Sequence, residues 1–492
     1  MSTRLQISIL SLGLLAGAVS AFAAAGDLDT SFDTDGKLDT KVSTNNFGFD
    51  SAKAVLVQPD GKTIAVGESD SRIALVRYLT NGVLDAAFGM GGVVITMLAE
   101  DDYFNIADAA LQPDGKLVVV GQVYFATNMS YDVVVARYQT NGVLDSSFGT
   151  GGIAAHDLGF DDSGEAVAIQ PDGRIVVAAY GYDFNLSQSV FAALRLLTNG
   201  TPDTAFSGNG WAEAEFSGRE AAHPSAIAMQ PDGKIMIAGY AFASNVSQIA
   251  LARFQTNGTL DGNFGVSGVV STSLGITNAY GEGVAIQADG RIVVAGSASF
   301  EFDGWLLAAR YQTNGALDLS FDTDGMVFSA GAGATAVALQ PDGKILMAGY
   351  VDNDTGLFRY DTNGSPDSTF GNSGRVQTAL GPAQDSAAAL AFQTDGKIVV
   401  AGSAFFPVTS DGRFVLARFL GDASVTPGPT LHVAAAPAGQ ATISWTPAMP
   451  GFVLQETWSL APANWTNSPS GATNPITVPA TEPTKFYRLF KP

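Results

Sequence analysis

Two glutamates occupy equivalent positions in a recurring pattern, each five residues before the glutamine of a Gln-x-Asp-Gly turn. Glu165 precedes Gln170, and Glu282 precedes Gln287. A pair of carboxyl groups can act as general acid and general base, or can hold a hard cation such as calcium. The equivalent positions before the other turns hold Lys53, Ala107, Ser225, Thr335 and Ala388. The sequence therefore predicts no ring of ligands. Both glutamates are expected in the loops that join the last strand of one repeat to the first strand of the next, and solvated acidic loops are the favoured interpretation.

Aromatic residues gather after the second predicted strand of each repeat, with Asp and Asn residues among them. The candidate ligand-binding rings are Tyr124, Tyr182, Phe184, Phe242, Phe302, Trp305 and Phe406, and the same segments also contain Tyr180 and Tyr240. Such rings beside amide and carboxylate groups suit stacking on, and hydrogen bonding to, sugars or peptides. Packing of the rings between repeats or onto neighbouring loops is the alternative interpretation.

Other kinds of chemistry find little support in the sequence. The chain has no cysteine, which removes thiol nucleophiles, thiolate metal ligands and disulfides. The histidines His156, His223 and His432 are too scattered to suggest a shared site, and no Gly-x-Ser-x-Gly, phosphate-loop or His-Glu-x-x-His motif occurs. Asp33 and Asp322 begin Asp-Thr-Asp-Gly segments that lack the later glutamate of an EF-hand calcium loop. We therefore assign no catalytic residue, no metal ligand and no cofactor.

The elements that position these residues repeat seven times along the chain. The Gln-x-Asp-Gly turns begin at Gln58, Gln112, Gln170, Gln230, Gln287, Gln340 and Gln393. An apolar strand ending in Arg plus an aromatic residue or Leu keeps step with them, at Arg77, Arg137, Arg195, Arg253, Arg310, Arg359 and Arg418. A Leu/Pro-Asp-x-x-Phe motif begins at Leu28, Leu84, Leu144, Pro202, Leu260, Leu317 and Pro366. Three motifs in phase indicate one repeating structural unit.

Each repeat has room for four strands, which we label a to d in chain order. The Pro-Asp-Gly turn closes an antiparallel hairpin of strands a and b, and the Arg-aromatic motif ends strand c. A four-stranded unit of this size cannot bury both faces alone, so radial stacking into a seven-bladed β-propeller is predicted. A parallel β-helix is excluded because its coils are much shorter. Since the first Asp-x-x-Phe motif precedes any strand a, residues 28–41 are expected to supply strand d of the seventh blade.

The motifs Gln-Pro-Asp-Gly-Lys, Ala-Arg-Tyr-x-Thr-Asn-Gly and Leu-Asp-x-Ser-Phe-Gly together resemble the bacterial delta-60 repeat family. The resemblance covers residues 26–422 and implies a β-propeller, while the family's function is uncharacterised. Departures are small: Ala288 and Thr394 replace the turn proline, and Leu196 replaces the aromatic residue after Arg.

The two ends of the chain differ from the repeats. Residues 1–25 have a basic start, an apolar run and an Ala-x-Ala pattern, which predict a secretory signal peptide. Residues 423–430 are a Pro/Gly/Thr linker. Residues 431–492 alternate apolar and polar residues in short segments, which predicts a small β-sandwich-like module. That module resembles the fibronectin-type-III-like or immunoglobulin-like domains that end many exported bacterial repeat proteins.

Charge and hydropathy limit the partners. The net charge of −22 repels nucleic acid and anionic lipid, and no segment after the signal peptide is apolar enough to span a membrane. We expect a secreted or cell-surface monomer that binds a glycan or a protein through its variable b–c and d–a loops. Two alternatives stay open: a lyase or glycosidase that uses Glu165 or Glu282 at the channel mouth, and a purely structural or adhesive surface protein.

Overall fold

The computed structural model describes most of the repeat region and parts of the C-terminal region. The described residues are 23–45, 47–97, 103–125, 130–159, 161–183, 188–218, 221–244, 246–274, 278–300, 303–422, 430–436, 440–446, 453–457, 466–468, 476–479 and 486–490. The chain divides into two compact units, residues 1–421 and 422–492. The predicted signal peptide falls almost wholly, and the predicted linker largely, outside the described residues.

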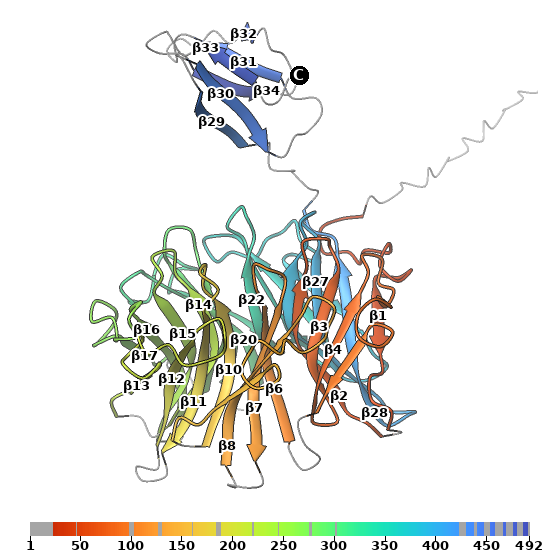
Figure 1. Ribbon diagram of the computed structural model, residues 1–492, viewed down its shortest axis with the longest axis vertical. Coiled ribbons are helices and arrows are strands. Elements are labelled where there is room, and N and C mark those ends of the chain that lie inside the picture. Colours follow the sequence, from red (N-terminus) through yellow and green to blue (C-terminus); the bar gives the residue numbers. More distant parts are fainter. Residues whose placement is uncertain are drawn as a thin grey trace, which may run out of the picture. The chain divides into compact units, whose positions relative to one another are not determined.

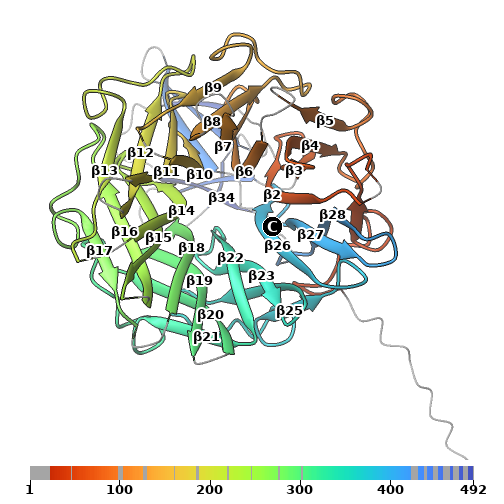
Figure 2. The same ribbon diagram turned by 90° about the horizontal axis from the view of Figure 1, so that it is seen from below.

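The first unit contains seven four-stranded antiparallel sheets arranged as blades around a central axis (Figure 2). Blades 1 to 3 are β2 (Asp50–Val57), β3 (Thr63–Ser69), β4 (Arg72–Tyr78) and β5 (Val93–Thr96); β6 (Tyr103–Leu111), β7 (Leu117–Phe125), β8 (Ser130–Tyr138) and β9 (Ile153–His156); and β10 (Asp161–Ile169), β11 (Ile175–Asp183), β12 (Gln188–Leu196) and β13 (Trp211–Ala214). Blades 4 and 5 are β14 (Ala221–Met229), β15 (Ile235–Ala243), β16 (Val246–Phe254) and β17 (Val269–Thr272); and β18 (Asn278–Ile286), β19 (Ile292–Phe300), β20 (Asp303–Tyr311) and β21 (Met326–Ala330). Blades 6 and 7 are β22 (Ala332–Leu339), β23 (Ile345–Val351), β24 (Asp354–Tyr360) and β25 (Arg375–Thr378); and β26 (Asp385–Phe392), β27 (Ile398–Phe406), β28 (Asp411–Phe419) and β1 (Lys37–Thr40). The prediction of a seven-bladed propeller is confirmed, with strand a of each blade innermost.

The a–b turns form as the sequence predicts. In blade 2, Gly115 has a φ of +82°, a left-handed conformation that glycine adopts without a steric penalty. Its N–H donates to the carbonyl of Gln112 at 2.9 Å, and the N–H of Gln112 donates to the carbonyl of Lys116 at 2.8 Å. This pair of bonds closes the hairpin of β6 and β7.

Apolar side chains between neighbouring blades form the core. Met236 and Leu251 of blade 4, for example, pack in one buried cluster with Ile292 and Leu307 of blade 5. Small, β-branched and aliphatic residues fill the flat space between two sheets. Burial of such a side chain stabilises the fold by about 1.5–3 kcal/mol, so stacking of the blades is the main source of stability.

The repeated Arg and Asp residues tie each blade to the next. In blade 4 the Nε–H of Arg253 donates to Asp261 at 2.9 Å, and the guanidinium lies 4.5 Å from the ring centre of Phe264. Its Nη1 donates to the carbonyl of Thr313 in blade 5 at 2.6 Å. Burial by itself would raise the pKa of Asp261, but a backbone hydrogen bond and the charges of Arg253 and Lys234 hold it below its usual value. The repeated charges therefore serve the architecture.

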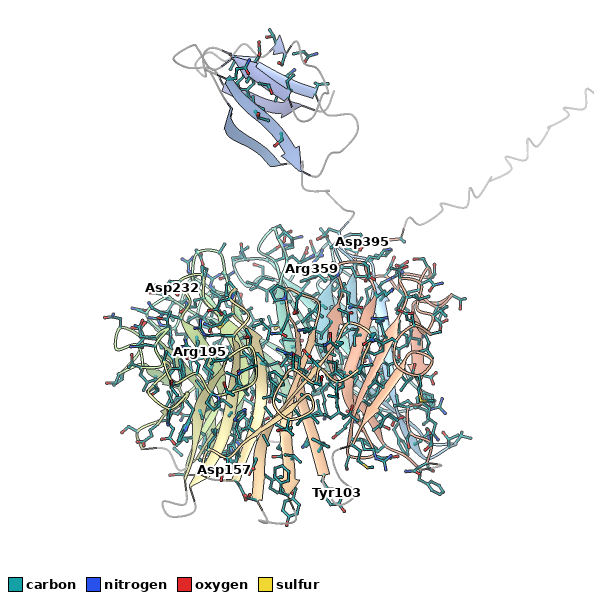
Figure 3. All side chains as sticks on the ribbon, viewed as in Figure 1. Tyr103, Asp157, Arg195, Asp232, Arg359 and Asp395 are labelled. Atoms are coloured by element: carbon teal, nitrogen blue, oxygen red, sulfur yellow. The ribbon has the colours of Figure 1, made fainter. Side chains whose placement is uncertain are left out.

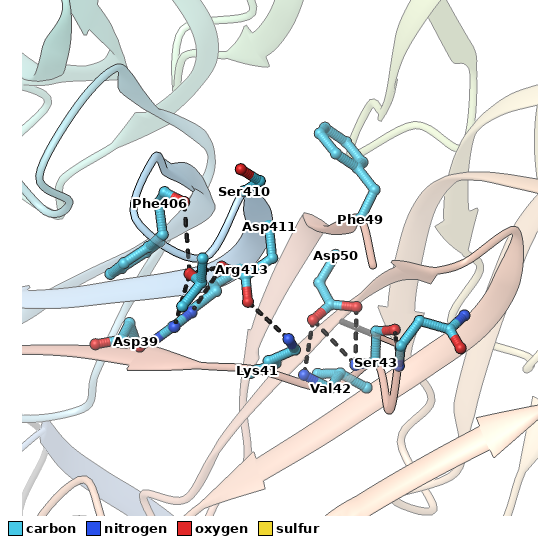
Figure 4. A network of polar contacts seen from close by, with 12 residues as sticks. Asp39, Lys41, Val42, Ser43, Phe49, Asp50, Phe406, Ser410, Asp411 and Arg413 are labelled. Atoms are coloured by element: carbon cyan, nitrogen blue, oxygen red, sulfur yellow. Dashed lines mark hydrogen bonds and ion pairs between the residues drawn. The ribbon is translucent and has the colours of Figure 1, made fainter. Parts of the chain in front are cut away.

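The ring closes where β1 pairs antiparallel with β28, with Leu38 opposite Leu416. The expectation that residues 28–41 supply strand d of the seventh blade is thus confirmed. Arg418 donates to Asp29 at 2.8 Å, which reproduces between distant parts of the chain the Arg–Asp pair that other blades form internally. Figure 4 shows further ion pairs across the closure: Lys41 with Asp411 at 2.7 Å, and Arg413 with Asp39 at 2.7 Å.

The two ends of the propeller carry different loops. Figure 3 places Asp232 and Asp395, from a–b turns, at one end of the propeller. At the opposite end lie Tyr103, the first residue of strand a in blade 2, and Asp157, which follows strand d of the same blade. Strand b runs antiparallel to strand a, and strand c runs antiparallel to strand b. The b–c connections therefore lie at the end opposite the a–b turns (Figure 1). Among the described residues no helix has the length and apolar character needed to cross a membrane.

The second unit contains two three-stranded antiparallel sheets. One sheet has β29 (Thr430–Ala436), β30 (Gln440–Thr446) and β33 (Ile476–Pro479), and the other has β31 (Val453–Thr457), β32 (Thr466–Asn467) and β34 (Phe486–Phe490). Ile443 and Val478 of the first sheet share a buried cluster with Leu454 and Tyr487 of the second. The resemblance of this module to fibronectin-like domains stays a prediction.

Candidate functional site: the wall of the central channel

Each innermost strand carries one β-bulge at the same repeat position. In blade 3 Gly164 pairs with Ala179 and Ala166 pairs with Ala178, so Glu165 is the extra residue between them. The extra residues of the seven strands are Lys53, Ala107, Glu165, Ser225, Glu282, Thr335 and Ala388. A bulge bends its strand and redirects the side chain of the extra residue. Glu165 and Glu282 therefore lie on β10 and β18, and their expected placement in d–a loops is corrected.

The bulge residues of six blades line one cavity in the channel wall. The cavity has a volume of about 640 Å³, within the range of small-molecule sites. Its lining includes both glutamates, Lys53, Asn105 and the hydroxyl-bearing residues Ser225, Ser297 and Thr335. Since strand a is innermost in every blade, residues from β2 to β22 meet here although they lie far apart in the sequence (Figure 2).

Four rings make a continuous wall across blades 3 to 5, which we call the channel aromatic run: Tyr180, His223, Tyr240 and Tyr280. The imidazole of His223 stacks on Tyr180 with centroids 4.4 Å apart, and on Tyr240 at 5.2 Å. Tyr240 meets Tyr280 edge to face at 4.9 Å. His223, Tyr240 and Tyr280 line the cavity together with the two glutamates.

The electrostatics of the site follow from its partial burial and its acidic character. Burial raises the pKa of both Glu165 and Glu282, and for Glu165 a hydrogen bond from Ser163 opposes the rise. Burial lowers the pKa of His223 and so favours the neutral imidazole. Burial, followed by the negative charges of Glu282 and Glu165, raises the pKa of Tyr240 to about 12. Both carboxyl groups thus act on the same phenol.

The cations and possible metal ligands near the cavity are few. Among the described residues, the cavity lining contains one lysine, Lys53, and no arginine. The Nζ of Lys53 lies 3.7 Å from a carboxylate oxygen of Glu68. Within the part of the chain that the structure describes, no three His, Asp or Glu side chains gather as a metal-ligand set. The site can therefore stack on a ring, accept hydrogen bonds from hydroxyl or ammonium groups, and exchange protons.

The aromatic residues singled out from sequence that the structure describes have different packing partners. Phe242 meets Tyr240 edge to face at 5.5 Å and therefore extends the channel aromatic run. Tyr124 pairs with Tyr131 of its own blade at 5.0 Å. Trp305 packs against the core between blades 4 and 5, and Phe406 lies under Arg413 at 4.0 Å. These three rings thus each have an intramolecular packing partner.

The structure describes the remaining sequence candidates only in part. Tyr182 belongs to β11, but its side chain is not among those described, and Phe184 and Phe302 lie outside the described residues. The importance of His223 and Tyr280 was missed from sequence. Both stand seven residues before a turn glutamine, Gln230 and Gln287, which is the signal that could have found them.

Seven four-stranded blades closed by an N-terminal strand define the class of protein, a seven-bladed β-propeller. The sequence matches the family model described as "Domain of unknown function (DUF5122) beta-propeller" in residues 58–88, 112–148, 170–206, 230–264, 287–321, 340–370 and 393–425. The chain thus carries seven repeats of this domain. Each match begins at a turn glutamine, and the first six end at the phenylalanine of Asp-x-x-Phe. The seventh repeat obtains that phenylalanine, Phe32, from the N-terminal segment.

Solved structures resemble the chain only distantly. They include the polysaccharide lyase Uly1, with 10% identity, a TM-score of 0.47, and 82% of this chain and 98% of that chain covered. Drosophila Semaphorin 2a has 8% identity, a TM-score of 0.48, and coverage of 82% and 77%. A protein of unknown function from Bacteroides caccae has 14% identity, a TM-score of 0.35, and coverage of 64% and 93%. Likenesses this low carry no information about ligand or activity. No curated protein matches the sequence.

Proposed function

We propose that this β-propeller is an exported saccharide-binding protein whose ligand occupies the cavity in the wall of the central channel. One observation carries the proposal: two half-buried carboxyl groups and three rings of the channel aromatic run line the same cavity. Aromatic faces stack on the C–H faces of sugar rings, and carboxylate and hydroxyl oxygens accept hydrogen bonds from sugar hydroxyls.

The position of the cavity supports a binding role. Sevenfold repeated residues keep the blades alike, whereas the cavity draws its chemistry from positions that differ between blades: Glu in two, and Lys, Ser or Thr in others. A specific site requires such a break in the repeat, because identical residues in every blade cannot distinguish one ligand orientation from another. The basic start, apolar run and Ala-x-Ala pattern of the first 25 residues support export, and a fibronectin-like C-terminal module suits a cell-surface role.

The test is a thermal-shift and calorimetric screen of the protein against neutral, amino and acidic oligosaccharides. A ligand that binds only the folded protein raises its melting temperature in proportion to saturation. We expect binding by one saccharide class, and loss of about tenfold or more in affinity for Tyr240→Ala, which removes the ring at the centre of the run. Circular dichroism of the variant checks that it remains folded.

A second variant separates the channel from the loop face. Phe405→Ala removes an exposed ring at the end of β27, next to the b–c connection of blade 7 and outside the cavity lining. Unchanged affinity in this variant supports the channel site. If Phe405→Ala abolishes binding and Tyr240→Ala does not, the channel site is wrong and the loop face binds the ligand.

Catalysis on a polysaccharide is the second candidate. The observation in its favour is that Glu165 and Glu282, whose pKa burial raises, share the cavity with His223, whose pKa burial lowers. Such an arrangement suits general acid–base chemistry. Release of new reducing ends or of unsaturated sugars from a polysaccharide panel tests it. Turnover that Glu165→Gln abolishes, in a folded variant, would establish an enzyme; tight binding without turnover would leave the binding function alone.

A further inference from the structure

The charge of the cavity restricts which saccharides fit it. Its lining contains the carboxyl groups of Glu165 and Glu282 and the cation of Lys53, and Lys53 is already 3.7 Å from Glu68. No arginine or lysine forms an ion pair with either glutamate among the described residues. A uronic acid or a sulfated sugar would bring further negative charge to two carboxylates without a countercharge, and like charges in a partly desolvated site repel strongly.

From these features we propose that the channel site selects saccharides that carry a primary ammonium group, with the ammonium held by Glu165 and Glu282 against the tyrosines of the channel aromatic run. This inference rests on the proposed saccharide-binding function and names its ligand class. An ammonium ion is the group that two carboxylates and aromatic faces recognise together, through charge-assisted hydrogen bonds and cation–π attraction.

The aromatic run strengthens the preference for a cation. Tyr240 and Tyr280 meet edge to face at 4.9 Å, and both line the cavity with Glu282, which belongs to the same strand as Tyr280. A cation over a desolvated ring gains about 2 kcal/mol, against about 0.5–1 kcal/mol at an exposed site. A neutral N-acetyl group would lose this attraction, and its amide would offer the carboxylates one uncharged N–H donor in place of the three charged N–H donors of an ammonium group.

Proton release on binding is a second consequence of the same geometry. Because burial holds the pKa of both carboxyl groups above the usual value, an incoming ammonium favours their ionised forms and lowers those pKa values. Binding of an ammonium sugar in mildly acidic solution therefore releases protons, whereas a neutral sugar, which removes water from the carboxyl groups without adding a positive charge, releases none.

The experiment compares two ligands that differ in this group alone: a tetramer of glucosamine and the tetramer of N-acetylglucosamine. Isothermal titration calorimetry of the full chain at about pH 5.5, in two buffers of different ionisation enthalpy, measures affinity and proton release together. We expect the amino form to bind about tenfold or more tightly, and to release protons. Glu282→Gln and Glu165→Gln should each reduce both the preference and the proton release.

A matched control variant is Glu215→Gln, which changes an exposed glutamate beyond the end of β13, outside the cavity lining. It should leave the preference for the glucosamine tetramer unchanged. That result would show that the preference depends on Glu165 and Glu282 and not on the overall negative charge of the protein. Equal or tighter binding of the N-acetylated tetramer, or of an acidic saccharide, would overturn the ammonium inference and leave saccharide binding intact. No binding by any saccharide of the screen would overturn both.

Discussion

The closure of the ring yields a prediction with an internal control. Phe32 and Phe264 are the equivalent phenylalanines of blades 7 and 4, both fully buried, with an arginine guanidinium 4.7 Å and 4.5 Å from the ring centre, respectively. Replacing a buried phenylalanine by alanine costs about 3–5 kcal/mol through lost burial and the cavity left behind. Similar surroundings predict a similar energetic cost for Phe32→Ala and Phe264→Ala.

The consequences of that cost differ because of chain connectivity. Phe264 lies between β16 and β17, so both of its neighbouring strands stay joined to it by the chain within blade 4. Phe32 belongs to the segment that ends in β1, which blade 7 holds only by non-covalent contacts such as the Asp29–Arg418 pair. A loss of about 3–5 kcal/mol there corresponds to a hundredfold or greater increase in local opening of β1.

Hydrogen exchange followed by mass spectrometry measures this opening directly. In Phe32→Ala we expect fast exchange in β1, while strands of blades 3 to 5 keep their protection. In Phe264→Ala we expect β1 to remain protected relative to the rest of the propeller, since its own contacts are intact. Equal protection of β1 in the two variants would refute the argument that the N-terminal strand closes the ring as a separable element.

Two further predictions concern the innermost strands. Asp108 on β6 accepts a hydrogen bond from the N–H of Val167 on β10 at 2.9 Å, and burial raises its pKa from the ordinary value of 3.8 to about 6. Its ionisation in the folded state therefore costs stability as pH rises from about 4 to about 6, by about 2 kcal/mol after allowance for solvent screening. In Asp108→Ala, the free energy of unfolding measured by urea melts should no longer fall between about pH 4 and about pH 6. A fall as large as that of the unsubstituted protein would contradict this role of Asp108. In blade 5 a Cβ on Gly296 would lie 1.9 Å from the carbonyl oxygen of Tyr280, so Gly296→Ala must displace the bulge that carries Glu282. We expect it to lower the melting temperature and to weaken saccharide binding, and a variant with both unaffected would contradict the role assigned to the bulge.

Much of the fold could be predicted from the sequence because its signals are local. Each a–b turn is specified by five consecutive residues, and the strand predicted to end in Arg plus an aromatic residue is found in blade 1 as β4 (Arg72–Tyr78). The closure also followed from the sequence, since the order of the motifs left the N-terminal Asp-x-x-Phe segment without a blade of its own. The d–a placement of Glu165 failed because β10 begins with the polar residues Asp161, Asp162 and Ser163. The bulge then shifts the phase of the alternation, so that Ala166 and Val167 are both buried and the pattern does not show one continuous strand.

The sequence by itself determined that the chain folds as seven similar blades, because turn chemistry and alternation act over a few residues and repeat in phase. Only the tertiary structure decided which side chains meet. His223 appeared isolated along the chain. The stacking of blades 3 and 4 places it between Tyr180 of blade 3 and Tyr240 of its own blade, and it lines the same cavity as both glutamates. The physical reason is that each blade contributes one inner strand to a shared channel. On that strand a bulge, which forms in the pairing with strand b, redirects the side chain of a single residue.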